Sequence, residues 1–328
     1  MQFRTGIETI PSSFRIRYED PVLLTGSCFT ENIGQRLKEV LFQTVINPFG
    51  VVYNPLSVKR SLELILSGRE YTSEDLEFYN EQWYSWDHHS SFSGPDQEKV
   101  LQDINLQLTM ASEFLKKASF VFISFGTAWV YRLKRTGNIV CNCHKVPARE
   151  FERKMLTVEE IYSSYKSVIQ HLLVFNPQLK IIFTVSPVRH WKDGAHGNQL
   201  SKSVLHLAVN QIIEDHKNLC EYFPSYEILL DDLRDYRYYS DDLLHPNQQA
   251  IDYIWEKFTH VYFDERTKKY MKEISGIVKA SNHRLKNPGT ESSKKFLEKQ
   301  IERIKLLKSG LPFLNWEKLS EKFKSVEI

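Results

Sequence analysis

Short apolar runs alternate with longer amphipathic stretches along this chain of 328 residues. That alternation is typical of a largely parallel β-sheet covered by helices. The apolar runs predict five strands, at Val22–Leu24, Gln43–Ile46, Phe120–Phe125, Lys180–Val185 and Glu227–Leu230. The amphipathic stretches predict six helices, at Thr30–Leu41, Pro55–Leu66, Asp96–Lys117, Thr157–Phe175, Gln199–Leu219 and Asn247–Phe258. The pattern therefore predicts the α/β class.

The end of the chain differs from the rest in both pattern and charge. The whole chain carries 43 Lys/Arg and 41 Asp/Glu, a net charge of +2 that gives no reason to expect nucleic acid. Residues 261–328, however, hold sixteen Lys/Arg against nine Asp/Glu. Within them Leu297, Ile301, Ile304 and Leu307 share one helical face. We expect a main domain at 1–264 and a basic helical extension at 265–328.

The four cysteines and the first residues of the sequence indicate the cellular compartment of the protein. Cys28, Cys141, Cys143 and Cys220 show no disulfide framework, and the first residues lack the apolar stretch of a signal peptide. No segment is long and apolar enough to predict a membrane span. These features predict a cytoplasmic protein without a membrane partner, in which Cys28 stays a thiol. Its oligomeric state is open.

The most informative chemistry lies where the first predicted strand meets the first predicted helix. Gly26-Ser27-Cys28 follows the apolar run, so a nucleophilic side chain is offered at a helix N-terminus, whose positive potential favours an anion. Far along the chain, Asp242-Leu-Leu-His245-Pro246-Asn247 opens the last predicted helix of the main domain. His245 is a candidate general base, and Asp242 (or Asp241, if the turn rotates) can orient its ring.

These motifs resemble those of the GSCFA-domain proteins, a family within the SGNH (GDSL-like) hydrolase group. The resemblance rests on Gly26-Ser27-Cys28-Phe29, Asn47-Pro-Phe-Gly50, Asn142-Cys-His-Lys145 and Asp242-x-x-His245-Pro246-Asn247, and it covers roughly residues 20–260. It implies a three-layer αβα sandwich with a mostly parallel sheet. It also implies catalytic groups at the carboxyl edge of that sheet.

The resemblance leaves two candidate nucleophiles. The group's Gly-Asp-Ser block, laid on Gly26-Ser27-Cys28, places the nucleophile at Cys28 and puts Ser27 in the Asp position. A thiol is the stronger nucleophile, whereas serine is the group's usual one. Neighbouring extended residues point opposite ways, so only one of the two faces the pocket easily. A cysteine at a strand end is also commonly a plain buried residue.

The oxyanion donors depart from the pattern that the resemblance implies. Gly50 can supply the second-block glycine, but the third block, Gly126-Thr127-Ala128, lacks its asparagine. Thr127 or Asn142 is a possible replacement. One missing donor costs about 10²–10³ in rate, which puts ordinary esterase activity in doubt.

Other polar residues are secondary candidates for substrate contacts. Cys141-x-Cys143-His144 is too compressed for a closed zinc site, so we expect no metal and no cofactor. The family pattern makes His144 a possible contact to a polar substrate group, beside a plain surface-loop reading. Arg189 after the fourth predicted strand suits a carboxylate or phosphate, or a salt bridge. His89 lies in the aromatic insertion Glu81–Gly94, which either forms the wall of a pocket or only packs onto the domain.

Together these features predict a hydrolase or acyltransferase that forms an acyl-enzyme on Cys28 or Ser27 with a small-molecule or carbohydrate acyl substrate. A catalytically silent module that binds a carbohydrate or polar metabolite is the alternative. A protein-interaction scaffold built on the basic extension is a third.

Overall fold

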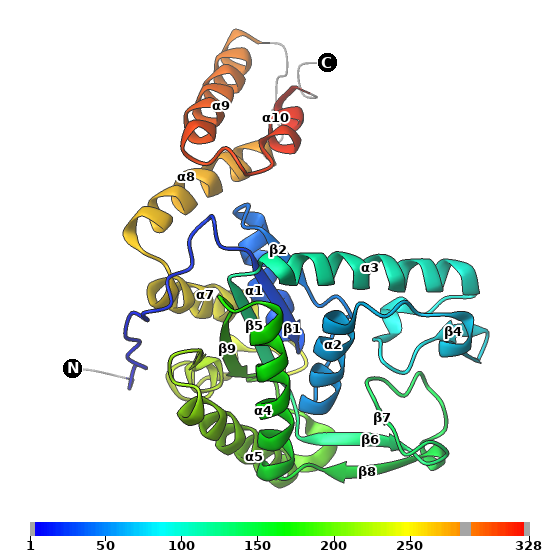
Figure 1. Ribbon diagram of the computed structural model, residues 1–328. Helices are drawn as coiled ribbons and strands as arrows, with labels where there is room; N and C mark the ends of the chain where they lie inside the picture. The colour runs from blue at the N-terminus through cyan, green and yellow to red at the C-terminus, as the bar shows by residue number, and fades with distance from the viewer. Residues whose placement is uncertain (1–3, 283–289, 325–328) are drawn as a thin grey trace.

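The computed structural model describes residues 4–282 and 290–324. At its centre lies a parallel five-stranded sheet in the order β10-β9-β5-β1-β2 (Figure 1). From one edge to the other, its strands are Cys220–Tyr222 (β10), Lys180–Val185 (β9), Phe120–Phe125 (β5), Val22–Gly26 (β1) and Thr44–Ile46 (β2). The sheet confirms the predicted α/β class.

Helices cover both faces of the sheet, because successive strand residues point to opposite sides. On one face, Leu23, Val121 and Ile181 join a core formed with α2 to α5. On the other, Val22, Leu24 and Phe122 pack with α1 and α7. The protein is therefore a three-layer sandwich. The helices are α1 (Cys28–Glu39), α2 (Pro55–Ser67), α3 (Gln97–Lys117), α4 (Val158–Phe175), α5 (Gly194–Asp215) and α7 (Gln248–Tyr262).

Two segments of the chain, one between α2 and α3 and one between β5 and α4, form small antiparallel sheets beside this sandwich. The first is the hairpin of β3 (Glu77–Tyr79) and β4 (Gln82–Tyr84). The second pairs β6 (Trp129–Leu133) with β7 (Ile139–Val140) and β8 (Phe151–Met155). Both lie at the end of the sandwich towards which α2 and the long α3 extend (Figure 1).

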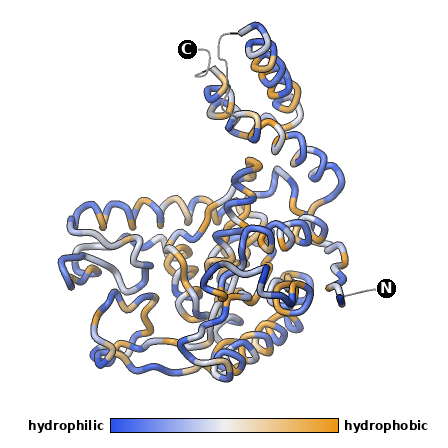
Figure 2. The backbone as a smooth tube through the Cα atoms, turned by 180° about the vertical axis from the view of Figure 1, so that it is seen from behind, coloured by the Kyte–Doolittle hydropathy of each residue, from blue (hydrophilic) through white to orange (hydrophobic). Residues whose placement is uncertain are grey.

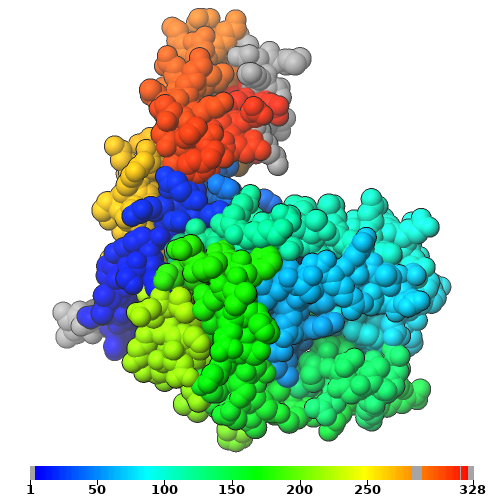
Figure 3. Space-filling view, in the orientation of Figure 1, coloured from blue at the N-terminus to red at the C-terminus, as the bar shows by residue number. Residues whose placement is uncertain are grey.

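The C-terminal residues form a helical appendage that projects from the sandwich (Figure 3). It consists of α8 (Glu265–Ser281), α9 (Glu291–Gly310) and α10 (Trp316–Lys324). The helices alternate hydrophilic and hydrophobic turns (Figure 2), and the predicted face of α9 is turned inward, with Leu297, Ile304 and Leu307 buried. Tyr18 ties the appendage to the sandwich through its edge contact with Tyr270, at a ring-centroid distance of 6.2 Å. No helix in the described ranges is long and apolar enough to cross a bilayer.

One predicted strand is wrong. The segment Glu227–Leu230 is helical, divided between α6 (Ser225–Glu227) and a π-helical turn at Ile228–Asp232. A short apolar run fits a buried strand and a buried helical turn equally well, and Ile228 and Leu229 are fully buried here. The edge strand is instead β10, which begins directly after the last residue of the predicted helix Gln199–Leu219.

Gly26 fixes the end of β1, and we expect its replacement to be severely destabilising. Its φ is +133°, and a Cβ there would lie 2.1 Å from the Ser124 carbonyl oxygen. Gly26→Ala should therefore lower the free energy of unfolding by at least about 3 kcal/mol in urea titration. The matched control is Gly137→Ala, which has a φ of +74° but open space around the added methyl, and should cost only about 1 kcal/mol. Equal losses in the two variants would contradict the role of the close approach.

Candidate active site

The turn from β1 into α1 points the two candidate nucleophiles in different directions. Ser27 is the N-cap of α1, where its Oγ accepts the Phe29 N–H at 3.3 Å. The same Oγ shares a 2.7 Å hydrogen bond with the Ser124 hydroxyl, and the residue is only 1% exposed. Cys28, the first residue of the helix, is instead partly exposed. An acyl group can therefore reach Cys28 more directly than Ser27.

The groups around the Cys28 sulfur act on its ionisation in opposing ways. Burial raises the pKa of the thiol, and the ammonium of Lys202 lowers it. Glu31 raises the pKa further, whereas the N–H groups of Cys28 and Phe29 at the start of α1 lower it. The helix N-terminus thus favours the thiolate, as the sequence suggested, but Lys202 is a neighbour that the motif did not indicate.

Asp242 and His245 form the pair that their spacing predicted. The Nδ1 atom of His245 lies 2.6 Å from Oδ2 of Asp242, while Oδ1 accepts the N–H groups of Leu244 and His245, each at 2.9 Å. These bonds lower the pKa of Asp242 to about 2, the His245 N–H being the largest cause. Asp242, and not Asp241, therefore orients the ring. Because Nδ1 is engaged, Nε2 is the nitrogen left for proton transfer.

Arg189 holds the loop that carries this pair. Its Nη2 donates to the Leu243 carbonyl oxygen at 2.6 Å, and its guanidinium lies over the rings of Trp191, Tyr236 and Tyr239 at 5.2 to 5.9 Å. Among the ion pairs of the described residues, none includes Arg189. The side chain predicted to meet an anion or a salt-bridge partner therefore contacts a backbone carbonyl and aromatic rings.

His245 does not contact either candidate nucleophile directly. In the described part of the chain no hydrogen bond joins its ring to Ser27 or Cys28, and its side chain is 50% exposed. His190 is a further histidine near this region: its pKa is lowered to about 4, first by burial, and the charges of Lys202 and His245 act on it as well. Its ring meets Tyr53 edge-on at 5.6 Å, and burial and the charge of Cys28 raise the pKa of Tyr53.

The backbone around Gly50 is held in a tight turn. Its N–H donates to the Asn47 carbonyl oxygen at 2.7 Å, so this donor is already engaged. The Oδ1 of Asn47 accepts the Gly26 N–H at 3.0 Å and the Thr30 hydroxyl at 3.1 Å. Asn47 thereby fastens the loop after β2 to the nucleophile turn, a role that its position directly after a strand could have indicated. Within residues 4–282 and 290–324, its buried Nδ2 has no hydrogen-bond partner.

The other candidate donors serve the local structure. The Thr127 hydroxyl bonds to the Ser201 hydroxyl at 3.1 Å and is buried. The Asn142 side chain accepts the His144 N–H at 2.8 Å. Nε2 of His144 lies 3.0 Å from the Ser85 carbonyl oxygen, and burial lowers the pKa of His144 to about 4. Nδ1 of His89 accepts the Ser91 N–H at 3.2 Å.

Two of these residues line a surface cavity of about 550 Å³ whose wall also includes Ser90 and Ser93. Asn142 and His144 contribute to its wall together with Lys145, and neither Cys28 nor His245 does. His89 lies closer to the predicted site, because its Cβ is 2.4 Å from where a Cβ on Gly50 would stand. Of the residues that the sequence grouped, Asn142 and His144 share this cavity wall and His89 lies against Gly50.

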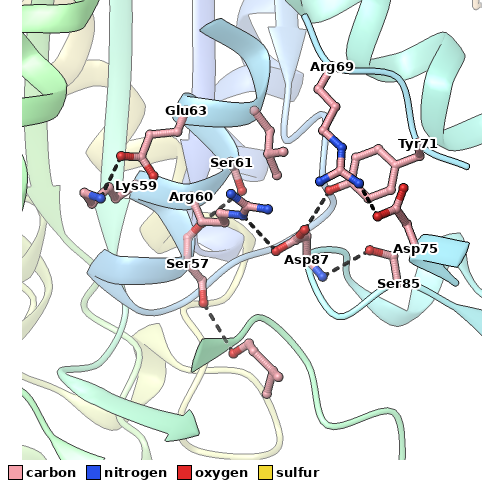
Figure 4. A network of polar contacts seen from close by, with 12 residues as sticks. Ser57, Lys59, Arg60, Ser61, Glu63, Arg69, Tyr71, Asp75, Ser85 and Asp87 are labelled. Atoms are coloured by element: carbon pink, nitrogen blue, oxygen red, sulfur yellow. Dashed lines mark hydrogen bonds and ion pairs between the residues drawn. The ribbon is translucent and has the colours of Figure 1, made fainter. Parts of the chain in front are cut away.

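A network of ion pairs fixes the aromatic insertion against α2 (Figure 4). Asp87 accepts Nε of Arg60 at 3.3 Å and the Tyr71 hydroxyl at 2.7 Å. The network lines a cavity of about 530 Å³ between α2, the β3–β4 hairpin and β7. Each basic group in its wall has an acidic partner: Lys59 with Glu63, Arg60 with Asp87, Arg69 with Asp75, and Arg135 with Glu77. Of these pairs, Arg60–Asp87 anchors the loop that carries His88 and His89 to α2.

Taken together, these features define a class: three-layer α/β proteins that bear a cysteine at a strand-to-helix turn and an Asp–His pair before a late helix. The chain belongs to the GSCFA family, whose model matches residues 21–258. Residues 274–326 match a second family model, that of the GSCFA domain protein, C-terminal domain. Most of the basic extension therefore matches a family model separate from that of the main domain.

One solved structure that the comparison with this chain found is a carbohydrate esterase family 3 from Talaromyces cellulolyticus. It is 9% identical, with a TM-score of 0.35, and the match covers 78% of this chain and 99% of that chain. No curated protein matches the sequence.

Proposed function

We propose that this protein is an SGNH-like hydrolase or acyltransferase that forms an acyl-enzyme on Cys28. The observation that carries the proposal is the Asp242–His245 pair, whose 2.6 Å contact engages Nδ1 and leaves Nε2 free. Such a pair is the orienting half of a catalytic triad. The partly exposed Cys28 at the start of α1 supplies the third member.

The chemistry follows from these three side chains. Nε2 of His245 closes onto the sulfur when substrate binds, since catalytic hydrogen bonds often tighten only in the complex. The Cys28 thiol gives its proton to Nε2 of His245, and the thiolate attacks the acyl carbonyl carbon. The tetrahedral intermediate then expels the alcohol or thiol, which takes that proton from His245. Water or an acceptor hydroxyl then gives its proton to His245 and attacks the thioester, releasing Cys28. Asp242, ionised above about pH 2, holds the ring throughout.

The proposed setting agrees with this chemistry. All four cysteines are free, which supports a reducing, cytoplasmic compartment in which Cys28 keeps its thiol. The substrate we propose is a small-molecule or carbohydrate acyl compound, and the reaction as written needs neither a metal nor a cofactor.

Mass spectrometry of the protein after exposure to p-nitrophenyl acetate tests this function. We expect a burst of p-nitrophenol and an acetyl group on the peptide that contains residue 28. Hydroxylamine should remove the acetyl group, because thioesters are labile to it. A protein that turns over no acyl ester and carries no adduct at residues 27 or 28 would contradict the proposal.

A catalytically silent binding module is the second candidate, and two contacts favour it. The Gly50 N–H is engaged by Asn47, and the Thr127 hydroxyl by Ser201, so neither is free to stabilise an oxyanion. Under this alternative, a screen of polysaccharides and polar metabolites by thermal shift would find saturable stabilisation without turnover.

A further inference from the structure

Lys202 is a buried, titratable side chain that has no role in the reaction proposed above. It lies on α5, is only 1% exposed, and reaches the carboxyl edge of the sheet. Its Nζ donates to the carbonyl oxygens of Gly126 and Ser186, each at 2.6 Å. These two residues directly follow β5 and β9, so the ammonium bridges the ends of two central strands. Gly126 also opens the block whose asparagine is missing.

The charge of Lys202 has no carboxylate partner. The ion pairs found among the described residues do not include it, and a buried ammonium without a counter-charge is strongly unfavourable. Burial lowers the pKa of Lys202 to about 7, and the charge of Cys28 is the influence that raises it. Buried lysines of this kind concentrate at functional sites.

The other titratable groups around this pair do not supply the missing negative charge. His190 and His206 feel the charge of Lys202, but burial lowers the pKa of each to about 4, so both are neutral near pH 7. The ring of Tyr226 lies 6.0 Å from Nζ. Glu31 on α1 raises the pKa of Cys28, and the charge of Cys28 in turn raises the pKa of Tyr53.

The register of the sheet brings the turn that carries Cys28 to this amine. Gly26 pairs with Ser124, so the turn begins beside the end of β5, where the Gly126 carbonyl oxygen accepts from Nζ. A tetrahedral Nζ has three positions besides its bond to carbon, and two of them carry N–H groups directed at Gly126 and Ser186. The third carries either a proton, as in the ammonium, or a lone pair that can accept one. A proton moving from the Cys28 thiol to that lone pair gives a thiolate and an ammonium, with no other reactant.

We propose that Lys202 is the ionic partner of the Cys28 thiolate and holds the reactive sulfur ready at the edge of the sheet. The inference deepens the proposed function, because it concerns the same sulfur. Lys202 is thus a positioning and activating residue. Because the thiol proton is then on Lys202, His245 takes a proton from solvent, gives it to the leaving group and regains one from the acceptor.

The rate of iodoacetamide alkylation at Cys28 as a function of pH tests this pairing, since only the thiolate reacts. Peptide mass spectrometry separates Cys28 from the other three cysteines. In Lys202→Met the half-maximal rate should move up by at least about one pH unit, which makes alkylation about tenfold slower on the rising limb. Lys180→Met is the matched control: its Nζ also donates to a carbonyl, that of Asn218 at 2.8 Å, and the Cys28 profile should not move. An unchanged profile in folded Lys202→Met would overturn the proposal.

If Lys202→Met does not fold, the pairing is tested from the other side, by measuring the pKa of Lys202 in a Cys28 variant. In protein labelled with ¹³C at lysine Cε, Cys28→Ser should lower the pKa of Lys202 read by NMR, because the thiolate that raises it is gone. No change in that pKa would overturn the pairing. Neither readout needs a substrate. A Cys28 that shows the shift but never acylates would reject the proposed function alone, and an acylating Cys28 without the shift would reject the pairing alone.

Discussion

Cys28→Ala should abolish the acyl-enzyme and lower the rate of ester cleavage by at least about 10³-fold, because no other side chain at the turn is positioned to replace the sulfur. Cys28 is partly exposed at the first position of α1, whereas the Ser27 hydroxyl is buried against Ser124. The measurements are the mass of the protein after exposure to p-nitrophenyl acetate and the rate of p-nitrophenol release.

Ser27→Ala is the matched control for this variant, one residue away. It should keep the adduct on Cys28. It should also lower the free energy of unfolding by about 1–2 kcal/mol, because α1 loses its N-cap and the Ser124 hydroxyl loses a buried partner. The reverse outcome, an adduct that survives in Cys28→Ala and disappears in Ser27→Ala, would make the serine the nucleophile.

The second large effect is expected from His245→Ala. Removing the group that transfers protons should slow both acylation and deacylation, by about 10²–10⁴-fold. Rapid mixing separates the two steps, since the burst reports acylation and the steady rate reports deacylation. Asp242→Asn should slow the same steps less, because the ring remains but loses the carboxylate bonded to Nδ1.

The pH dependence of this pair has a defined sign. The pKa of Asp242 is lowered to about 2, so its contact with His245 is fully present above the ordinary Asp pKa of about 4 and is lost as the pH falls towards 2. Asp242→Asn should therefore differ from the wild type throughout the neutral range. His260→Ala, at an exposed position in the last turn of α7, is the control and should keep full activity. Full activity in His245→Ala would reject the proposed mechanism.

Local signals were enough to predict most elements. Asn54 caps α2 directly before Pro55, where the predicted helix Pro55–Leu66 begins, and a Thr157–Glu160 capping box opens α4 at the start of the predicted helix Thr157–Phe175. The strands β5 and β9 have the predicted bounds because long apolar runs between turns leave little choice. The error at Glu227–Leu230 arose where a run is too short to separate a strand from a helical turn.

The candidate site was predictable only as far as its chemistry lies in contiguous motifs. The Asp242–His245 contact joins residues three apart on one loop, so spacing alone was sufficient. Asn142 and His144 were grouped with Cys28 through a family motif, and they line a cavity whose wall includes neither Cys28 nor His245. Spacing cannot tell on which side of an inserted sheet a loop will pack.

By itself, the amino-acid sequence determined the α/β class, the caps of the helices, the nucleophile turn and the Asp–His loop, because each depends on neighbouring residues. The tertiary structure decided that Ser27 is buried and Cys28 is not, that Arg189 supports the Asp–His loop, and that Lys202 reaches the end of the sheet. These outcomes depend on the order β10-β9-β5-β1-β2, which brings Cys28 and Lys202 together from elements far apart in the chain. No local pattern of polar and apolar residues encodes that order.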